Sequence, residues 1–237
     1  FTAKHGETIG IIGGTGSGKS SVVNLIPRFY DVTKGRVLVD GVDVKDYSPE
    51  VLRSRIGIVP QKAVLFAGTI VENLRWGKKD ASKEEMWKAL EISQSKEFVE
   101  KKDGQLESRI EQGGKNLSGG QRQRIGIARA LATNPRFIVC DEAVSALDVS
   151  IQAQVINLMQ DIKKEFSLTY MFISHDLRII KHFCDRVMVM YLGNIVEIGT
   201  KDAIYEKRRH PYTQALLSAI PNIRKQENEH RILLTGC

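Results

Sequence analysis

The chain has 237 residues, of which 42% are hydrophobic and 27% charged, and its 35 basic and 28 acidic side chains give a formal net charge of +7. This composition excludes general disorder and supports one substantial core with room for a smaller lobe. Three cysteines are too few for a disulfide framework or a zinc site, and no apolar run approaches the roughly 18–20 residues needed to span a bilayer, so any membrane role requires a partner or sequence outside this chain. The mild positive charge suits an anionic nucleotide or a membrane surface, and it also suits simple solubility.

The first predicted strand and helix enclose a glycine-rich loop. Residues 7–12 form a short apolar strand, and a helix is expected from Lys19 to about Ile26, where Pro27 removes a donor and ends it. The loop at 13–20 reads GGTGSGKS and fits G-x-x-x-x-G-K-[ST]. In such a loop the backbone N–H groups bind phosphates, the lysine supplies positive charge and the serine a magnesium ligand. The strand–loop–helix order therefore predicts a nucleoside triphosphate site.

Strands and helices continue to alternate after this loop. A hairpin is expected across Asp40-Gly41, and a buried strand at 56–59 ends at Pro60. Helical periodicity with polar faces dominates from about Gly77 to Ala132. The clearest helices in that stretch are expected at 83–92 and 118–132.

The last third of the chain has three further apolar strands, at 137–140, 168–173 and 186–192. Ser150 is the expected N-cap of a helix that runs to about Phe166. Strands that are apolar throughout and are separated by helices indicate a parallel sheet covered on both faces. The fold class predicted from these elements is α/β.

Two adjacent carboxylates follow the strand at 137–140. Ligands bind beyond the carboxyl ends of parallel strands, where the glycine-rich loop also begins. Because successive strand side chains point to opposite faces, the two acids are expected to differ in role. Asp141 would hold Mg²⁺ directly or through water, and Glu142 would orient and polarise the water that attacks the γ-phosphate. A solvated strand end is the alternative interpretation.

A second phosphate-binding signature, LSGGQ, lies at 117–121. Ser118-Gly119-Gly120 opens a predicted helix, whose unpaired N–H groups and partial positive charge favour anions. The two glycines allow an oxygen to approach the backbone closely. Taken alone, the pentapeptide is best explained by an N-cap serine followed by a turn.

The order of these motifs resembles the ABC-transporter ATPase family over essentially the whole chain. The motifs are, in order, the glycine-rich loop, Gln61, residues 117–121, Asp141-Glu142, residues 145–148 and His175. The resemblance implies a P-loop NTPase core with a parallel sheet, a small antiparallel β region and an inserted helical subdomain. It also implies a head-to-tail homo- or heterodimer, in which ATP and Mg²⁺ lie between the glycine-rich loop of one subunit and Ser118-Gly119-Gly120 of the other.

The resemblance assigns site roles by position. Gln61 matches the loop that senses Mg²⁺ and water and faces the membrane partner, His175 matches the residue that contacts the γ-phosphate and positions Glu142, and Asp148 matches the loop that crosses between subunits. Catalytic roles fall on Lys19, Gln61, Glu142 and His175, and metal contacts on Ser20, Gln61 and Asp141. The residues expected to bind nucleotide are Gly13, Gly14, Thr15, Gly16, Ser17, Gly18, Lys19, Ser20, Ser21, Ser118, Gly119, Gly120, Gln121 and Asp148.

The same resemblance divides the chain into four segments. These are the first part of the P-loop core (1–76), the helical signature subdomain (77–133), the second part of the core (134–200) and a C-terminal extension (201–237). The expected partners are a second ATPase subunit and integral-membrane permease domains at the cytoplasmic face of the membrane, and no nucleic acid is expected. Cys140 is expected to be a small core residue, as are the methionines of the strands.

The two halves of the chain resemble two different subfamilies. Up to the signature helix the chain is similar to exporter ATPases, and after it to oligopeptide or dipeptide importers. The exporter-like segments are 64–70 and 109–116, and the importer-like segments are 140–154 and 210–217 with Pro221. Three origins remain open: a natural recombinant, a deliberate chimera and an artificial joining of two genes. In each case the change from the exporter-like to the importer-like sequence falls within residues 117–131. The chain is expected to be a fragment, because Phe1 enters a strand almost at once and Cys237 ends it without a tail.

The function predicted from these features is an ATP-hydrolysing subunit that powers an ABC transporter, with peptide import favoured by the C-terminal extension. An exporter ATPase domain cut from its transmembrane domain is the alternative within the family. Other classes are a soluble ABC-type ATPase in DNA repair or translation and a nucleotide-binding regulatory module without turnover. The catalytic residues are all present, which weighs against the regulatory module, and a small GTPase is disfavoured because no Asn-Lys-x-Asp motif occurs.

Overall fold

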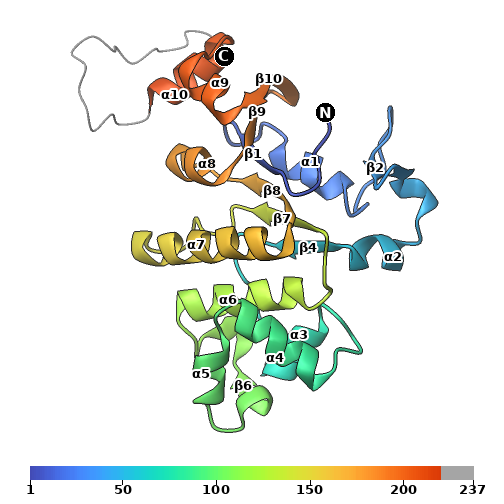
Figure 1. Ribbon diagram of the computed structural model, residues 1–237, viewed down its shortest axis with the longest axis vertical. Helices are drawn as coiled ribbons and strands as arrows, with labels where there is room; N and C mark the ends of the chain where they lie inside the picture. Colours follow the sequence, from blue (N-terminus) through green and yellow to red (C-terminus); the bar gives the residue numbers. More distant parts are fainter. Residues whose placement is uncertain (220–237) are drawn as a thin grey trace.

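The structure, a computed structural model, describes residues 1–219, so the expectations for Pro221 and Cys237 lie outside the described residues. A central sheet carries helices on both faces, and a helical lobe lies at the end of the molecule where β4 forms the sheet edge (Figure 1). No helix within residues 1–219 combines the length and the apolar character that a membrane crossing requires.

The central sheet has six strands in the order β10-β9-β1-β8-β7-β4, and all neighbours are parallel except β9 and β10. Its strands are β1 (Thr8–Ile12), β4 (Ile56–Val59), β7 (Phe137–Asp141), β8 (Thr169–Ile173), β9 (Arg186–Tyr191) and β10 (Asn194–Thr200). The parallel sheet predicted from the apolar strands is confirmed. The antiparallel edge strand β10 was not predicted, because its residues are exposed or half-buried and form no apolar run.

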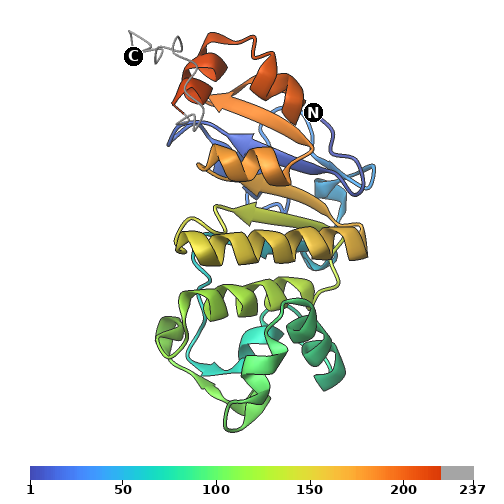
Figure 2. The same cartoon turned by 60° about the vertical axis from the view of Figure 1, so that its left-hand side comes forward.

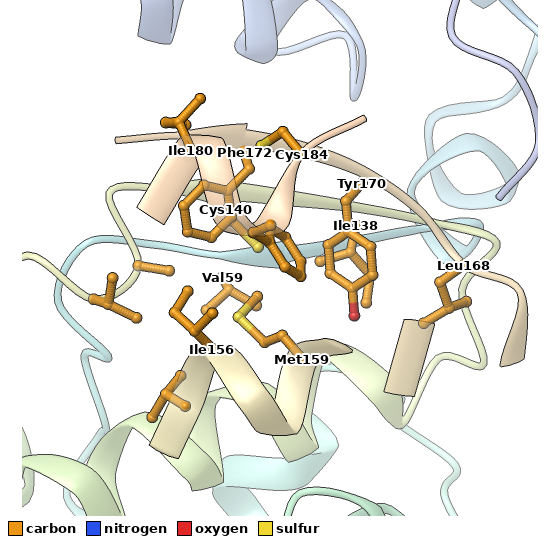
Figure 3. Close-up of a cluster of buried hydrophobic side chains, with 14 of the residues drawn as sticks. Val59, Ile138, Cys140, Ile156, Met159, Leu168, Tyr170, Phe172, Ile180 and Cys184 are labelled. Carbon is orange, nitrogen blue, oxygen red and sulfur yellow. The ribbon is translucent and has the colours of Figure 1, made fainter. Parts of the chain in front are cut away.

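Helices cover both faces of this sheet. The helices outside the lobe are α1 (Lys19–Leu25), α2 (Pro49–Ser54), α7 (Val149–Phe166), α8 (Leu177–Phe183), α9 (Lys201–Glu206) and α10 (Pro211–Ser218), with a 3₁₀ turn at Val44–Asp46. One buried cluster joins α7 and α8 to the sheet, with Cys140, Tyr170 and Phe172 among its members (Figure 3). A second cluster on the opposite face contains Met171 and the β9 methionines together with side chains of α1 and α2. Cys140 and these methionines are core residues, as expected.

The helical lobe has its own hydrophobic cluster. The elements of the lobe are α3 (Ile70–Arg75), α4 (Lys83–Ile92), α5 (Lys96–Glu100), α6 (Gly119–Leu131), the short antiparallel pair β5 (Gly68–Thr69) and β6 (Arg109–Ile110), and 3₁₀ turns at Gln105–Glu107 and Gln112–Gly114. The cluster already includes Leu65 and Ile70, so residues upstream of Gly77 pack with the lobe. Helix α6 contributes to this cluster and to that of the sheet, and it lies beside α7 between the two (Figures 1 and 2).

Two local features bear on the sequence predictions. Strands β2 (Leu38–Val39) and β3 (Val42–Asp43) form the expected antiparallel hairpin, with Asp40 and Gly41 both at positive φ. The prediction that Ser150 caps the long helix is wrong. Helix α7 begins at Val149 with Asp148 as its N-cap, because Asp148 already has the extended backbone that ends the preceding loop.

Candidate active site

The glycine-rich loop leaves β1 in a conformation that depends on its glycines. Gly13, Gly16 and Gly18 have φ values of 152°, 77° and 91°, which L-residues with a Cβ rarely adopt. A Cβ on Gly13 would lie 2.2 Å from the carbonyl oxygen of Met190, so the loop is packed directly on β9. The buried Ser17 Oγ has no hydrogen-bond partner among the described residues, as expected of a loop that is completed by a ligand.

Lys19 lies at the start of α1 with its ammonium group turned back over the loop. Its Nζ donates to the carbonyl oxygens of Gly13 at 2.9 Å and Gly14 at 2.8 Å. Burial lowers the pKa of Lys19, and the nearby negative charges of Glu142 and Asp141 act in the opposite direction. A partly desolvated cation thus lies within a loop of backbone groups that is suited to phosphate oxygens.

Asp141 ends β7 next to this loop. Its carboxylate is hydrogen-bonded to the side chain of Ser20 and is half-buried. Burial raises the pKa of Asp141, the hydrogen bond from Ser20 lowers it, and the charge of Glu142 raises it. The structure therefore brings together Lys19, Ser20 and Asp141, two of which had been expected to contact a metal ion.

Glu142 follows Asp141 with a positive φ of 51°, a strained backbone for a non-glycine residue. Its Oε1 lies 2.5 Å from Nε2 of His175, and its Oε2 accepts a hydrogen bond of 3.0 Å from Nε2 of Gln61. These side chains follow β7, β8 and β4, which are adjacent in the sheet. Parallel pairing thus places the three side chains together at the carboxyl end of the sheet, although up to 114 residues separate them in the sequence.

Ser145 belongs to the same cluster and was not among the predicted site residues. Its hydroxyl accepts a hydrogen bond from Gln61 Nε2 at 3.1 Å and donates to the backbone oxygen of Glu142 at 3.0 Å. Ser145 therefore links the amide of Gln61 to the strained backbone of Glu142. The sequence signal that could have identified Ser145 is its position in the segment 145–148, which is one of the motifs that resemble the family.

The second phosphate-binding signature lies elsewhere in the same chain. Ser118 is the N-cap of α6: its Oγ accepts from Gln121 N at 3.2 Å, and its N–H donates to Gln121 Oε1 at 3.0 Å. Helix α6 lies beside β4 and the lobe, whereas the glycine-rich loop follows β1 (Figure 1). Asp148 is exposed and makes no side-chain cap hydrogen bond. The structure does not bring Ser118, Gly119, Gly120, Gln121 or Asp148 to the Lys19 cluster.

A groove of about 450 Å³ runs between α2, β4 and the helical lobe. Its lining includes Arg53, Val64, Phe66, Trp76 and Arg129. The rings of Phe66 and Trp76 pack against each other with centroids 4.8 Å apart and planes tilted by 32°, and Trp76 is 67% exposed. The groove thus offers aromatic surface at the end of the same segment that begins with Gln61.

Comparisons with known proteins agree with this geometry. Residues 1–145 match the ABC transporter family, and residues 196–235 match the family described as oligopeptide/dipeptide transporter, C-terminal region. The chain is 44% identical over its full length to the oligopeptide transport ATP-binding protein AppF of Bacillus subtilis strain 168, covering 74% of that protein, and 41% identical to the dipeptide transport ATP-binding protein DppF of Escherichia coli K12, covering 72%.

A solved structure of a bacterial Atm1-family ABC exporter with ATP bound has the same fold, with a TM-score of 0.78 and 33% identity over 90% of this chain. The chain spans 37% of that exporter's polypeptide. Both predicted resemblances, to exporters and to peptide importers, are therefore found. With a family match over more than half of its length, the chain belongs to the ABC transporter ATP-binding family and is an ATPase.

Proposed function

We propose that this chain is the ATP-hydrolysing subunit of a peptide importer and that it acts at the cytoplasmic face of the membrane. The observation that carries the hydrolytic role is the cluster of Gln61, Glu142 and His175 beside Lys19 at one edge of the sheet. The peptide cargo rests on the names of the relatives and on the C-terminal region that matches peptide transporters.

In the proposed site the phosphates of ATP lie on the glycine-rich loop. Lys19 exchanges its two backbone carbonyl acceptors for phosphate oxygens, which suit its partly desolvated charge better than neutral acceptors do. Glu142 orients the attacking water and accepts its proton, with Gln61 and His175 fixing the carboxylate from two sides. In this arrangement Lys19 binds phosphate, Glu142 is the general base, and Gln61 and His175 both position Glu142.

The residues that would hold Mg²⁺ are Ser20, Asp141 and Gln61. A hydroxyl, one carboxylate and an amide oxygen are hard oxygen donors, which match the preference of Mg²⁺ for one or two carboxylates completed by waters and phosphates. Among the described residues no group of three or more His, Cys, Asp or Glu forms a metal site by itself, so the substrate phosphates would have to complete the coordination. When bound, the ion neutralises charge that develops on the phosphates.

The proposed site is completed by a second ATPase subunit. Ser118, Gly119 and Gly120 lie at the start of α6, away from the loop of their own chain, and α6 has 13 residues with a fully formed N-terminal cap. Such a helix start presents N–H groups and a partial positive charge to an anion from another molecule. Asp148 is exposed at the start of α7 and is available to the crossing between subunits.

The permease is proposed to dock in the groove beside Phe66 and Trp76. The exposed indole, its packed neighbour Phe66 and the flanking Arg53 and Arg129 suit an amphipathic segment with an apolar face and acidic or polar ends. Because Gln61 lies five residues before Phe66, movement of this segment would connect the docking surface to the Glu142 cluster.

The substitution Glu142→Gln tests the hydrolytic assignment. The amide keeps an acceptor for Gln61 but cannot accept the proton of water, so kcat is expected to fall about 10²- to 10⁴-fold while ATP binding persists. An ATP-dependent dimer should then accumulate, as measured by light scattering. Glu165→Gln removes an exposed carboxylate of α7 and is the matched control, expected to behave as the parent. Hydrolysis at the parent rate by Glu142→Gln would refute the assignment.

Cargo and direction are tested separately, by reconstituting the chain with its permease partners in vesicles. ATP-driven movement of labelled di- and oligopeptides toward the compartment that contains this subunit is expected. Movement of cargo away from that compartment would assign the chain to the exporters, which its structural neighbour also represents.

A further inference from the structure

The C-terminal extension contacts the glycine-rich loop directly. The hydroxyl oxygen of Tyr212, at the start of α10, accepts a hydrogen bond of 2.8 Å from the backbone N–H of Gly14. The two residues are 198 positions apart in the sequence. None of the sequence predictions gave Tyr212 a role, because its segment had served only to indicate a subfamily.

Tyr212 is held in place from several sides. Its ring packs against that of Tyr191 in β9, with centroids 4.2 Å apart and ring planes tilted by 32°, and its backbone N–H donates to Nδ1 of His210, which caps α10. The turn before α10 is in turn fixed by Glu197 of β10, whose carboxylate accepts from the backbone N–H groups of Arg209 and His210 at 3.0 and 3.1 Å. The hydroxyl is therefore a positioned acceptor rather than a mobile surface group.

The start of the loop is held by several contacts. Gly13 packs on β9, the carbonyl oxygen of Gly14 accepts from Ser17 N at 3.2 Å, and the N–H of Gly14 donates to Tyr212. The carbonyl oxygens of Gly13 and Gly14 both accept from the ammonium group of Lys19. In the proposed ATP complex Lys19 turns to the phosphates and releases both carbonyls. The hydrogen bond from Gly14 N–H to Tyr212 does not depend on Lys19, so it persists when the lysine moves.

We infer that Tyr212 is a positioning residue for nucleotide binding, through which the C-terminal extension holds the start of the phosphate loop in its binding conformation. The inference rests on the proposed placement of ATP on this loop. A loop that is ordered before binding loses less conformational freedom when the phosphates arrive, so removal of the hydroxyl weakens ATP binding without touching the reacting groups. The KM and Kd for ATP should therefore rise, while kcat stays near the parent value.

The test is the substitution Tyr212→Phe in the full chain, which removes one oxygen and keeps the ring that packs against Tyr191. Loss of one neutral hydrogen bond predicts an increase of about 3- to 10-fold in Kd and KM for ATP, with kcat within about twofold of the parent. The amide of Gly14 should exchange its hydrogen faster. The matched control is Tyr205→Phe, which removes a hydroxyl that donates to the backbone oxygen of Leu177 in the neighbouring helix α8.

The outcomes separate this inference from the proposed site. Lys19→Ala is measured in parallel, with thermal unfolding of the nucleotide-free variants as the check on folding. Parent-like ATP affinity in Lys19→Ala would overturn both the placement of ATP and the role of Tyr212. Lost affinity in Lys19→Ala together with parent-like affinity or unchanged Gly14 exchange in Tyr212→Phe would overturn the role of Tyr212 alone. Equal changes in Tyr212→Phe and Tyr205→Phe would do the same.

Discussion

At the scale of single residues, the site buries charged groups, and their burial lowers the free energy of unfolding. Asp141 is half-buried and its pKa is raised, first by burial, while the pKa of the largely buried Lys19 is lowered by the same cause. Each shift means that the charged form is less favourable in the folded chain than in water. Glu142 adds a strained backbone. These features suit a site that awaits a charged ligand, and they reduce the stability of the chain without it.

Asp141→Asn is therefore expected to stabilise the nucleotide-free chain. The folded parent binds the Asp141 proton more tightly than the unfolded chain does, so its free energy of unfolding falls as the pH rises from the ordinary value of 3.8 through the raised pKa. At pH 7 the variant, which lacks this penalty, should have a Tm about 1–2 °C above the parent.

The measurement is thermal unfolding between pH 4 and pH 8. The gain from Asp141→Asn should shrink toward pH 4 and should be replaced by a loss when Mg²⁺ and ATP are added, since the variant lacks a proposed metal ligand. A variant that is less stable than the parent in the absence of nucleotide at pH 7 would contradict the argument. Asp161→Asn, an exposed change of the same type on α7, is the control.

At the scale of elements, two helices begin with the same capping arrangement but are expected to differ in function. Ser82 and Glu85 start α4 with reciprocal hydrogen bonds, as Ser118 and Gln121 start α6, and both serine oxygens accept at 3.2 Å. The local chemistry is the same for the two helix starts. Of the two helices, only α6 begins within the LSGGQ signature, and it contributes fully buried side chains to the clusters of both the lobe and the sheet.

Ser118→Ala and Ser82→Ala should therefore separate the cap from the proposed binding of a second subunit's nucleotide. Each loses one N-cap acceptor and should lower the free energy of unfolding by about 1 kcal/mol. Only Ser118→Ala should also weaken ATP-dependent dimerisation in the Glu142→Gln background, as measured by light scattering across ATP concentrations. Equal dimerisation of the two variants would limit Ser118 to a capping role.

At the scale of the whole molecule, the chain consists of a sheet core and a helical lobe that share α6 and border one groove. The groove lies next to the segment that links Gln61 to the lobe, so a partner docked there would contact both bodies. An exposed aromatic pair at such a junction is typical of an interface rather than of a solvated surface.

Trp76→Ala should consequently affect transport more than hydrolysis. The indole is 67% exposed, so its loss should leave the basal ATPase rate of the isolated chain within about twofold. In vesicles with the permease, peptide transport is expected to fall about tenfold or more, because central aromatic residues of interfaces contribute about 2 kcal/mol or more. Leu38→Ala, an exposed apolar change on the β2–β3 hairpin, is the control. Equal transport by both variants would exclude the groove as the docking site.

The sequence by itself determined the features that depend on local chemistry. Glycines at 13, 16 and 18 permit the positive φ values of the loop, apolar runs form the parallel strands, and Pro27 ends α1, since each of these follows from the residues involved and their neighbours. The motif order was enough to predict the family and the acidic residues of the site. Local signals failed at β10, which has no apolar run, and at the cap of α7, where Ser150 and Asp148 are both acceptable by composition.

Tertiary structure alone decided which distant groups meet. Strand order placed Gln61 and Glu142, 81 residues apart, within 3.0 Å, and packing of the C-terminal extension brought Tyr212 to Gly14 across 198 residues. It also drew Leu65 and Ile70 into the lobe, upstream of the boundary expected at Gly77. The physical reason is that such contacts are set by the burial of shared apolar surface and by the register of neighbouring strands, which are properties of the assembled core and not of any one segment.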